Sequence, residues 1–196
     1  MAASRGRDEV VCRYYRKPGK VNTRDVLEAA GRRAGELGIK MALIPSVSGE
    51  TALAAVDVLG GASQIIAITH VAGFGEPNVQ EMGAGNRMRL ESAGVRIFTG
   101  QHAFGGVGRA VRNKLGTYQV DEIMAFTLRT FGQGTKVAVE IALMAADAGL
   151  VRTDEDIIST GGTGKGVDTA LVIRPSNSFR FFELKVREVI CKPREF

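Results

Sequence analysis

Residues 41–51 read MALIPSVSGET, an apolar run that passes directly into a turn of hydroxyl residues and glycine. The pattern predicts a strand over Met41–Pro45 and a helix that follows the turn and continues to Leu59. A strand that leads through a short turn into a helix is the repeating unit of α/β proteins with parallel sheets. In open sheets of this kind ligands bind beyond the carboxyl ends of the strands, so the turn also predicts where a site lies.

The same alternation continues on both sides of this segment. Further strands are expected at residues 10–15, 65–69, 95–99, 157–160, 168–174 and 185–191, and further helices at 23–37, 79–92, 108–115, 121–131 and 136–148. Asn22 with Asp25 three residues later is a variant of the capping box that begins many helices. Only the glycine-rich loop 161–166 separates strands 157–160 and 168–174, so we expect them to pair antiparallel as a hairpin. The chain is therefore predicted to be an α/β protein with a mostly parallel, mixed sheet.

The composition is that of an ordinary soluble protein, with 44% hydrophobic and 24% charged residues. We expect a basic, flexible leader at residues 1–9 and one domain over residues 10–196. The first twenty residues hold six basic and two acidic side chains, which is +4 of the total charge of +5. Since the rest of the chain is nearly neutral, we expect no nucleic-acid partner.

The sequence gives little support for membrane association or for a metal site. No apolar run approaches the roughly 20 residues that cross a bilayer, so no membrane association is expected. We expect no signal peptide, and the two cysteines, Cys12 and Cys191, are few, which together favour a reduced, cytoplasmic protein. These cysteines become neighbours if the terminal strands pair. The two histidines, His70 and His102, show no metal-ligand spacing, and no dinucleotide fingerprint is present.

The turn after Pro45 is the strongest candidate for a ligand site. Hydroxyl groups and glycine N–H groups at a helix N-terminus bind phosphate, aided by the helix dipole. The residues of this predicted phosphate cradle are Ser46, Val47, Ser48, Gly49, Glu50 and Thr51. The alternative is that Ser48 is only the N-cap of the helix, with Thr51 at its N3 position. A cap needs one such residue and the turn has three, which favours phosphate binding.

Two other strand ends add polar residues to the predicted site. Thr69 and His70 follow the strand over residues 65–69, and His70 could act there as an acid or base. The strand over residues 157–160 ends at Thr160, and the loop that follows adds Gly161, Gly162, Thr163, Gly164 and Lys165 to the predicted site. It is not a Walker A loop, because Gly166 rather than Ser or Thr follows the lysine. Lys165 could close over a phosphate as a point charge, and a mobile hairpin tip is the alternative.

The helix over residues 136–148 carries unusual charges on an otherwise apolar surface. Lys136, Glu140 and Asp147 fall near one stripe. Asp147 stands near the helix C-terminus, where the dipole disfavours a carboxylate, so we expect it to have a specific partner. An ion pair that braces the core is favoured over catalysis. If the protein is an enzyme, the candidate acid–base groups are Lys17, His70, Glu140 and Asp147.

Several segments together resemble a known family. Residues 41–52, 65–69 and 160–170 are similar to a strand–turn–helix unit, a strand and the last glycine-rich loop of the C-terminal α/β domain of pyruvate kinase. A closer resemblance is to small archaeal and bacterial proteins with a pyruvate kinase α/β domain, in segments 17–19, 22–23, 48–51, 136–141, 144–149, 168–170, 172–175 and 188–191. The resemblance covers roughly residues 10–194, and the combination is specific although each short motif alone is not.

The resemblance implies a three-layer α/β/α sandwich whose mixed sheet contains at least one antiparallel strand. The catalytic barrel of pyruvate kinase has no counterpart in these residues. In many pyruvate kinases the turn matching residues 46–51 holds a phosphate of a sugar-bisphosphate activator, and Asp168 and Thr169 match the end of the last loop. Flavin mononucleotide (FMN) is a ligand associated with the small proteins of the group.

We therefore expect a protein that binds a phosphorylated small molecule, with FMN as the cofactor and with no metal. One alternative is a flavin-dependent or sugar-phosphate enzyme. Another is a structural or regulatory subunit that assembles through a sheet edge or a helix face. We also expect the chain to form a homo-oligomer.

Overall fold

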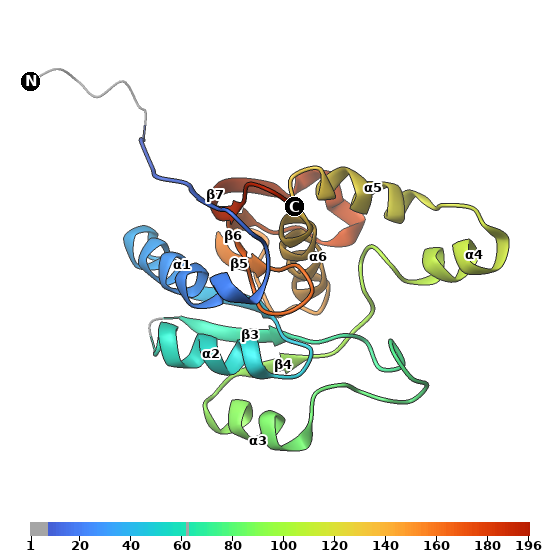
Figure 1. Cartoon of the computed structure of the whole chain (residues 1–196), viewed down its shortest axis with the longest axis horizontal. Coiled ribbons are helices and arrows are strands. Elements are labelled where there is room, and N and C mark those ends of the chain that lie inside the picture. The colour runs from blue at the N-terminus through green and yellow to red at the C-terminus, as the bar shows by residue number, and fades with distance from the viewer. Residues whose placement is uncertain (1–7, 62) are drawn as a thin grey trace, which may run out of the picture.

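A computed structural model describes residues 8–61 and 63–196, and within them seven strands form one sheet in the order β1-β7-β6-β5-β2-β3-β4 (Figure 1). The strands are β1 (Arg13–Tyr15), β2 (Met41–Pro45), β3 (Gln64–Ile68), β4 (Arg96–Phe98), β5 (Ile157–Gly161), β6 (Thr169–Arg174) and β7 (Lys185–Pro193). β6 runs antiparallel to β5 and β7, and the other neighbouring strands are parallel. The predicted mostly parallel, mixed sheet and the β5–β6 hairpin are confirmed.

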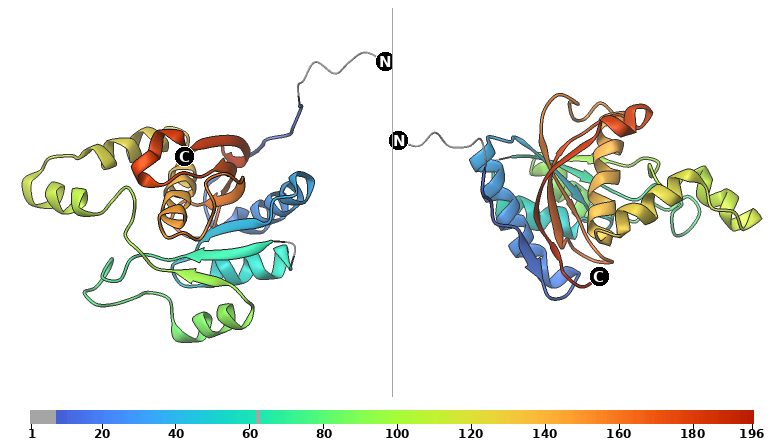
Figure 2. Two further views of the ribbon diagram at one scale, coloured as in Figure 1. Left: turned by 180° about the vertical axis from the view of Figure 1, so that it is seen from behind. Right: turned by 90° about the horizontal axis from the view of Figure 1, so that it is seen from above.

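Helices cover both faces of the sheet and make the expected three layers (Figure 2). They are α1 (Thr23–Leu37), α2 (Glu50–Leu59), α3 (Ala84–Ser92), α4 (Val107–Leu115), α5 (Val120–Arg129) and α6 (Gln133–Asp147), with short 3-10 helices η1 (Lys20–Asn22) and η2 (Ser178–Glu183). α1 and α2 pack on one face, with α3 beside α2, and α6 packs on the other face. α4 and α5 extend away from the sheet as an arm.

Alternation along the strands creates a separate hydrophobic core on each face. Ala42 and Ile44 of β2 belong to the core beneath α1 and α2, whereas Leu43 between them belongs to the core beneath α6. β6 follows the same rule, with Val172 on the first face and Leu171 on the second. Successive side chains of a strand point to opposite faces, so a sheet covered on both sides needs apolar residues at every position.

The capping box predicted at the start of α1 is wrong. Asn22 ends the preceding 3-10 turn in a helical conformation, and its side-chain amide donates to the Lys17 carbonyl oxygen at 2.7 Å. The Asp25 carboxylate faces β1, where it accepts hydrogen bonds from the Tyr15 hydroxyl at 2.6 Å and from Arg13 at 2.7 Å. The Asp25 side chain is therefore hydrogen-bonded to polar groups of the neighbouring strand β1, and not to the start of the helix as the local motif predicted.

Several element boundaries also differ from the prediction. The helix expected from residue 79 begins only at Ala84, because Gln80 is held at the end of β3 by hydrogen bonds to the Thr69 hydroxyl at 3.0 Å and the His70 carbonyl at 3.1 Å. α6 begins at Gln133, three residues earlier than expected. The terminal strands do pair, with Arg13 opposite Cys191, and both cysteines are free thiols.

Of the predicted basic leader, residues 1–7 lie outside the described residues, and Asp8 and Glu9 have no regular secondary structure. None of the helices in the described part of the chain is long and apolar enough to span a bilayer.

Candidate functional site

A cavity of about 170 Å³ lies where β2 and β3 end and α6 begins. Its apolar wall includes Pro45, Ile68 and Met144. The ionisable residues that line it are His70, His102, Arg109, Arg129, Lys136 and Glu140. This is the carboxyl edge of the parallel strands, the position at which α/β sheets bind their ligands.

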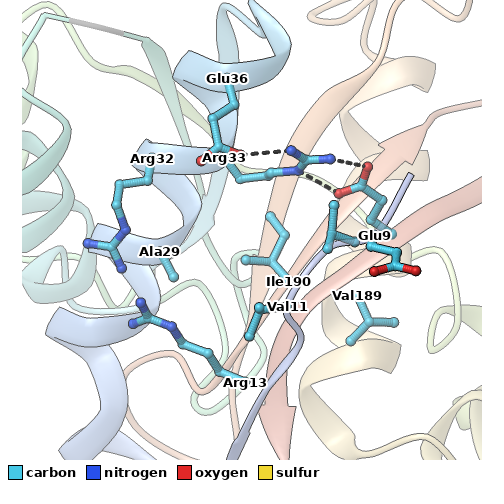
Figure 3. A pocket seen from close by; sticks show the side chains of 11 residues that line it. Glu9, Val11, Arg13, Ala29, Arg32, Arg33, Glu36, Val189 and Ile190 are labelled. Carbon is cyan, nitrogen blue, oxygen red and sulfur yellow. Dashed lines mark hydrogen bonds and ion pairs between the residues drawn. The ribbon is translucent and has the colours of Figure 1, made fainter. Parts of the chain in front are cut away.

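A larger groove of about 450 Å³ between α1 and β7 is less suited to an anion (Figure 3). The guanidinium of Arg33 is held by Glu188 at 2.7 Å and by Glu36 at 2.7 Å. The guanidinium of Arg13 is paired with Asp25. Two of the three arginines at this groove are therefore neutralised by carboxylates of the same chain.

Lys136 and Glu140 form an ion pair inside the core, as their spacing of one helical turn predicts. Both residues are 4% exposed. Glu140 Oε1 also accepts the backbone N–H of Phe104 at 3.0 Å. Burial lowers the pKa of Lys136, and the negative charge of Glu140 opposes that shift. The pair thus places a desolvated amine and a hydrogen-bonded carboxylate together at the cavity wall.

His102 lies next to this pair, although the sequence gives no sign of it. The ring accepts the Val71 N–H at Nε2 over 3.4 Å, so the proton of the neutral ring is on Nδ1. Nδ1 is 4.0 Å from Glu140 Oε2. Burial lowers the pKa of His102, while Glu140 acts in the opposite direction. His102 is therefore an imidazole whose charged form is disfavoured by burial, although it lies beside a buried carboxylate.

Three rings form one side of the cavity mouth. The rings of Phe74 and His102 stack at a centroid distance of 5.2 Å, and His70 is 4.1 Å from Phe74. His70 Nδ1 is 2.7 Å from Glu81 Oε2, which fixes the orientation of its ring. Phe74 is 42% exposed, so it offers an aromatic surface to a ligand at the mouth.

Two arginines of the arm, Arg109 and Arg129, add positive charge to the cavity. Arg109 lies over the Phe74 ring at 5.6 Å, and Arg129 donates from Nε to the Gln133 side-chain oxygen at 2.7 Å. In the described part of the chain neither guanidinium is paired with a carboxylate. With Lys136, three basic side chains line the cavity, and among the described residues that line it Glu140 is the one carboxylate.

The predicted phosphate cradle is divided by the structure. Ser46 and Val47 line the cavity, whereas Ser48 and Gly49 lie against α3 and Glu50 pairs with Lys20 at 3.1 Å. The Ser46 hydroxyl accepts the Ala52 N–H at 3.1 Å, and the Ser48 hydroxyl accepts the Glu50 N–H at 3.4 Å. Both hydroxyls thus accept hydrogen bonds from backbone N–H groups at the start of α2, as the alternative of helix capping predicts. The N-cap residue itself is Gly49 and not Ser48.

Asn86 of α3 covers the outer side of this turn. Its side-chain amide donates to the Ser48 carbonyl at 2.9 Å. Gly49 has φ 95°, and a Cβ atom there would lie 2.8 Å from Asn86 Cβ. Glycine is therefore required at Gly49 both by the backbone conformation and by the close approach of α3.

The glycine-rich loop 161–166 lies against the loop that follows β1, and none of its residues lines the cavity. Asp168 joins the two loops, because its Oδ2 accepts the N–H groups of Gly19 at 2.8 Å and Thr163 at 3.1 Å. Its Oδ1 accepts the Thr169 hydroxyl at 2.9 Å. Thr160 donates to the Leu43 carbonyl at 3.1 Å. Asp168, Thr169 and Thr160 thus hold the hairpin base, while Lys165 is exposed at its tip.

The four predicted acid–base groups separate into two sets. His70 and Glu140 line the cavity with Thr69, but Lys17 lies in the exposed loop after β1. Asp147 has the partner that its position predicts, since it accepts the Ser178 N–H at 2.8 Å and the Ser178 hydroxyl at 2.5 Å at the start of η2. No group of three or more metal-ligating side chains occurs among residues 8–61 and 63–196.

Fold and site together define a single-sheet α/β protein with a cationic cavity at the carboxyl ends of two parallel strands. The family model described as "Pyruvate kinase, alpha/beta domain" matches residues 24–173, a span of 150 residues in a chain of 196. The chain therefore belongs to the pyruvate kinase α/β domain family, as its sequence motifs indicate. The matched span includes every residue that lines the cavity.

Proposed function

We propose that the protein binds a phosphorylated small molecule in the cavity at the ends of β2 and β3. The observation that carries the proposal is the pair of guanidinium groups, Arg109 and Arg129, that line the cavity without a carboxylate partner in the described residues. A planar guanidinium recognises phosphate oxygens through two parallel hydrogen bonds. α6 begins at Gln133, which lines the cavity, and the positive end of its dipole also favours an anion.

FMN is the leading candidate ligand, and the dimensions of the site suggest how it would lie. The cavity of about 170 Å³ is smaller than the roughly 300–1,000 Å³ usual for whole ligands. It can take the phosphate and the neighbouring chain, while the flavin ring would rest at the mouth. Phe74, with 42% of its surface exposed, provides the stacking surface there.

Replacement of both arginines by glutamine is expected to weaken FMN binding by at least tenfold in calorimetric titration. The reason is that a charge-assisted hydrogen bond contributes about 1.5–3 kcal/mol, which is roughly a tenfold change in affinity or more. Arg24, which is exposed on α1 and does not line the cavity, supplies the control Arg24→Gln. Equal affinity of R109Q/R129Q and R24Q would rule out the arginines as the phosphate partners.

A second measurement decides whether the phosphate is bound in the cavity or at the turn over residues 46–51, which the sequence favours. FMN is added to the protein, excess is removed by desalting, and the visible flavin absorption is recorded. We expect the band to persist in S48A/T51A, because the Ser48 hydroxyl already accepts a hydrogen bond from the start of α2. Loss of the band in S48A/T51A but not in R109Q/R129Q would place the phosphate at the turn instead.

A specific observation also favours an enzyme that acts on a sugar phosphate. Lys136, Glu140 and His102 bring a buried amine, a carboxylate and an imidazole together at one cavity wall. Ionisable groups with shifted pKa values cluster at active sites, although a structural ion pair shifts them too. A reaction that is lost on replacement of His102 by Asn, with FMN binding intact, would support this second function.

A further inference from the structure

We propose that Lys136 forms an imine with the carbonyl group of a small phosphorylated aldehyde or ketone held in the cavity. The inference rests on the proposed function, because the phosphate held by Arg109 and Arg129 is what brings the carbonyl carbon to the amine. Lys136 lines the same cavity as both arginines. The cavity thus contains the amine of Lys136, a carboxylate of Glu140 that can carry protons, and two arginines that can bind the phosphate of the substrate.

The surroundings of Lys136 suit a nucleophilic amine. Its side chain is 5% exposed, and Nζ lies 5.9 Å from the centre of the Phe104 ring. Burial lowers its pKa, and the positive charges of Arg129 and Arg109 act in the same direction. Only the neutral amine attacks a carbonyl, and a lysine that is desolvated beside other cations is the usual form of an imine-forming lysine.

Glu140 is in direct contact with the amine and can carry the protons of the reaction. The ammonium first gives a proton to Glu140, and the neutral amine then forms the new bond to the carbonyl carbon. Glu140 returns that proton to the carbonyl oxygen, and a second proton from the nitrogen follows when the carbon–oxygen bond breaks. One ammonium and one carbonyl compound thus give one protonated imine and one water, with the net charge unchanged.

His102 extends this proton path away from the amine. Its Nδ1 lies 4.0 Å from Glu140 Oε2, and its ring also lines the cavity. The remaining ionisable group at the wall is His70, which is fixed by Glu81 at 2.7 Å. A cavity of about 170 Å³ favours a substrate of few carbon atoms, such as a three- or four-carbon sugar phosphate. A bound flavin phosphate would occupy the same place and would compete with it.

The test is reductive trapping on the full chain with dihydroxyacetone phosphate and sodium cyanoborohydride. We expect one adduct by intact-protein mass, mapped to Lys136 by peptide analysis. Unphosphorylated dihydroxyacetone at the same concentration should label Lys136 at least tenfold more slowly. The exposed Lys185 supplies the control, since K185M should be labelled like the original chain and K136M/E140Q should not. The double variant is chosen because it leaves no lone buried charge.

Calorimetry with glycerol 3-phosphate, which lacks a carbonyl group, separates this inference from the proposed function. Binding that depends on Arg109 and Arg129, without an adduct at Lys136, would overturn the imine and leave anion binding intact. Absence of both binding and adduct would overturn the imine, and the FMN titration of R109Q/R129Q then decides the proposed function separately. Labelling spread over surface lysines, equal with and without the phosphate, would also refute the role of Lys136. Since the adduct is mapped on the unaltered chain, this conclusion does not depend on the variants folding.

Discussion

Replacement of Glu140 by Ala is expected to lower the free energy of unfolding by about 3–5 kcal/mol, the usual cost of leaving one partner of a buried ion pair alone. Lys136 and Glu140 are each 4% exposed, so the ammonium that remains is poorly solvated. The Phe104 N–H loses its acceptor in the same variant. Urea denaturation followed by circular dichroism measures the change.

The matched control for this prediction removes both charges together. In K136M/E140Q the core keeps similar volumes, and the new glutamine side chain could still accept the Phe104 N–H. We expect the double variant to recover most of the lost stability, because replacing a whole buried pair by groups of similar shape is often close to neutral. If E140A were as stable as the original chain, the pair would not be desolvated in solution and the proposed imine at Lys136 would lose its basis.

Replacement of Gly134 by Ala is the second change with a large expected effect. A Cβ atom there would lie 2.2 Å from Thr169 Oγ1 and 2.6 Å from Asp168 Oδ1. Those groups are held by the hydrogen bonds of the hairpin base and cannot withdraw without breaking them. We expect a loss of about 1–3 kcal/mol or more, as for other overpacked cores, measured by the same denaturation.

Gly35 of α1 provides the control, since it is also helical but a Cβ atom added to it would meet no other atom within 4 Å. Gly35→Ala is expected to raise stability by up to about 1 kcal/mol, because alanine is the better helix former. Because the two replacements are expected to change stability in opposite directions, their comparison separates the packing of α6 from helix propensity. Equal changes in both variants would show that α6 does not approach the β5–β6 hairpin closely enough to exclude a methyl group.

The strands were largely predictable because the apolar runs needed to cover both faces of the sheet are visible in the sequence. The hairpin followed from a single short loop at residues 161–166, and the observed pairing of Ile157 with Ile173 agrees with it. α1 begins at Thr23 as predicted, but the capping pair was wrong, because Asn22 and Asp25 have partners in β1 and the adjoining loop. Local motifs cannot anticipate a competing partner supplied by the tertiary structure.

Many of the residues that line the cavity were not predicted, for a related reason. Ser46, Thr69 and His70 follow strands, so the rule for strand ends identified them. Arg109 and Arg129 come from the arm, and His102 from an irregular loop 32 positions after His70, yet the two imidazole rings are 5.3 Å apart. No periodicity links such positions. The spacing of Lys136 and Glu140 was visible, because one turn of helix places them together.

The edge strand β1 has β7 as its neighbour in the sheet, and Arg13 lies opposite Cys191. On the ribosome, residues 13–15 leave the exit tunnel long before their partners at 191–193 have been made. The parallel units from β2 to β4 can form during synthesis, whereas β1 must wait until β7 has been made. Among the seven strands, the one made first therefore pairs only after the one made last, and deletion of residues 191–193 should release β1.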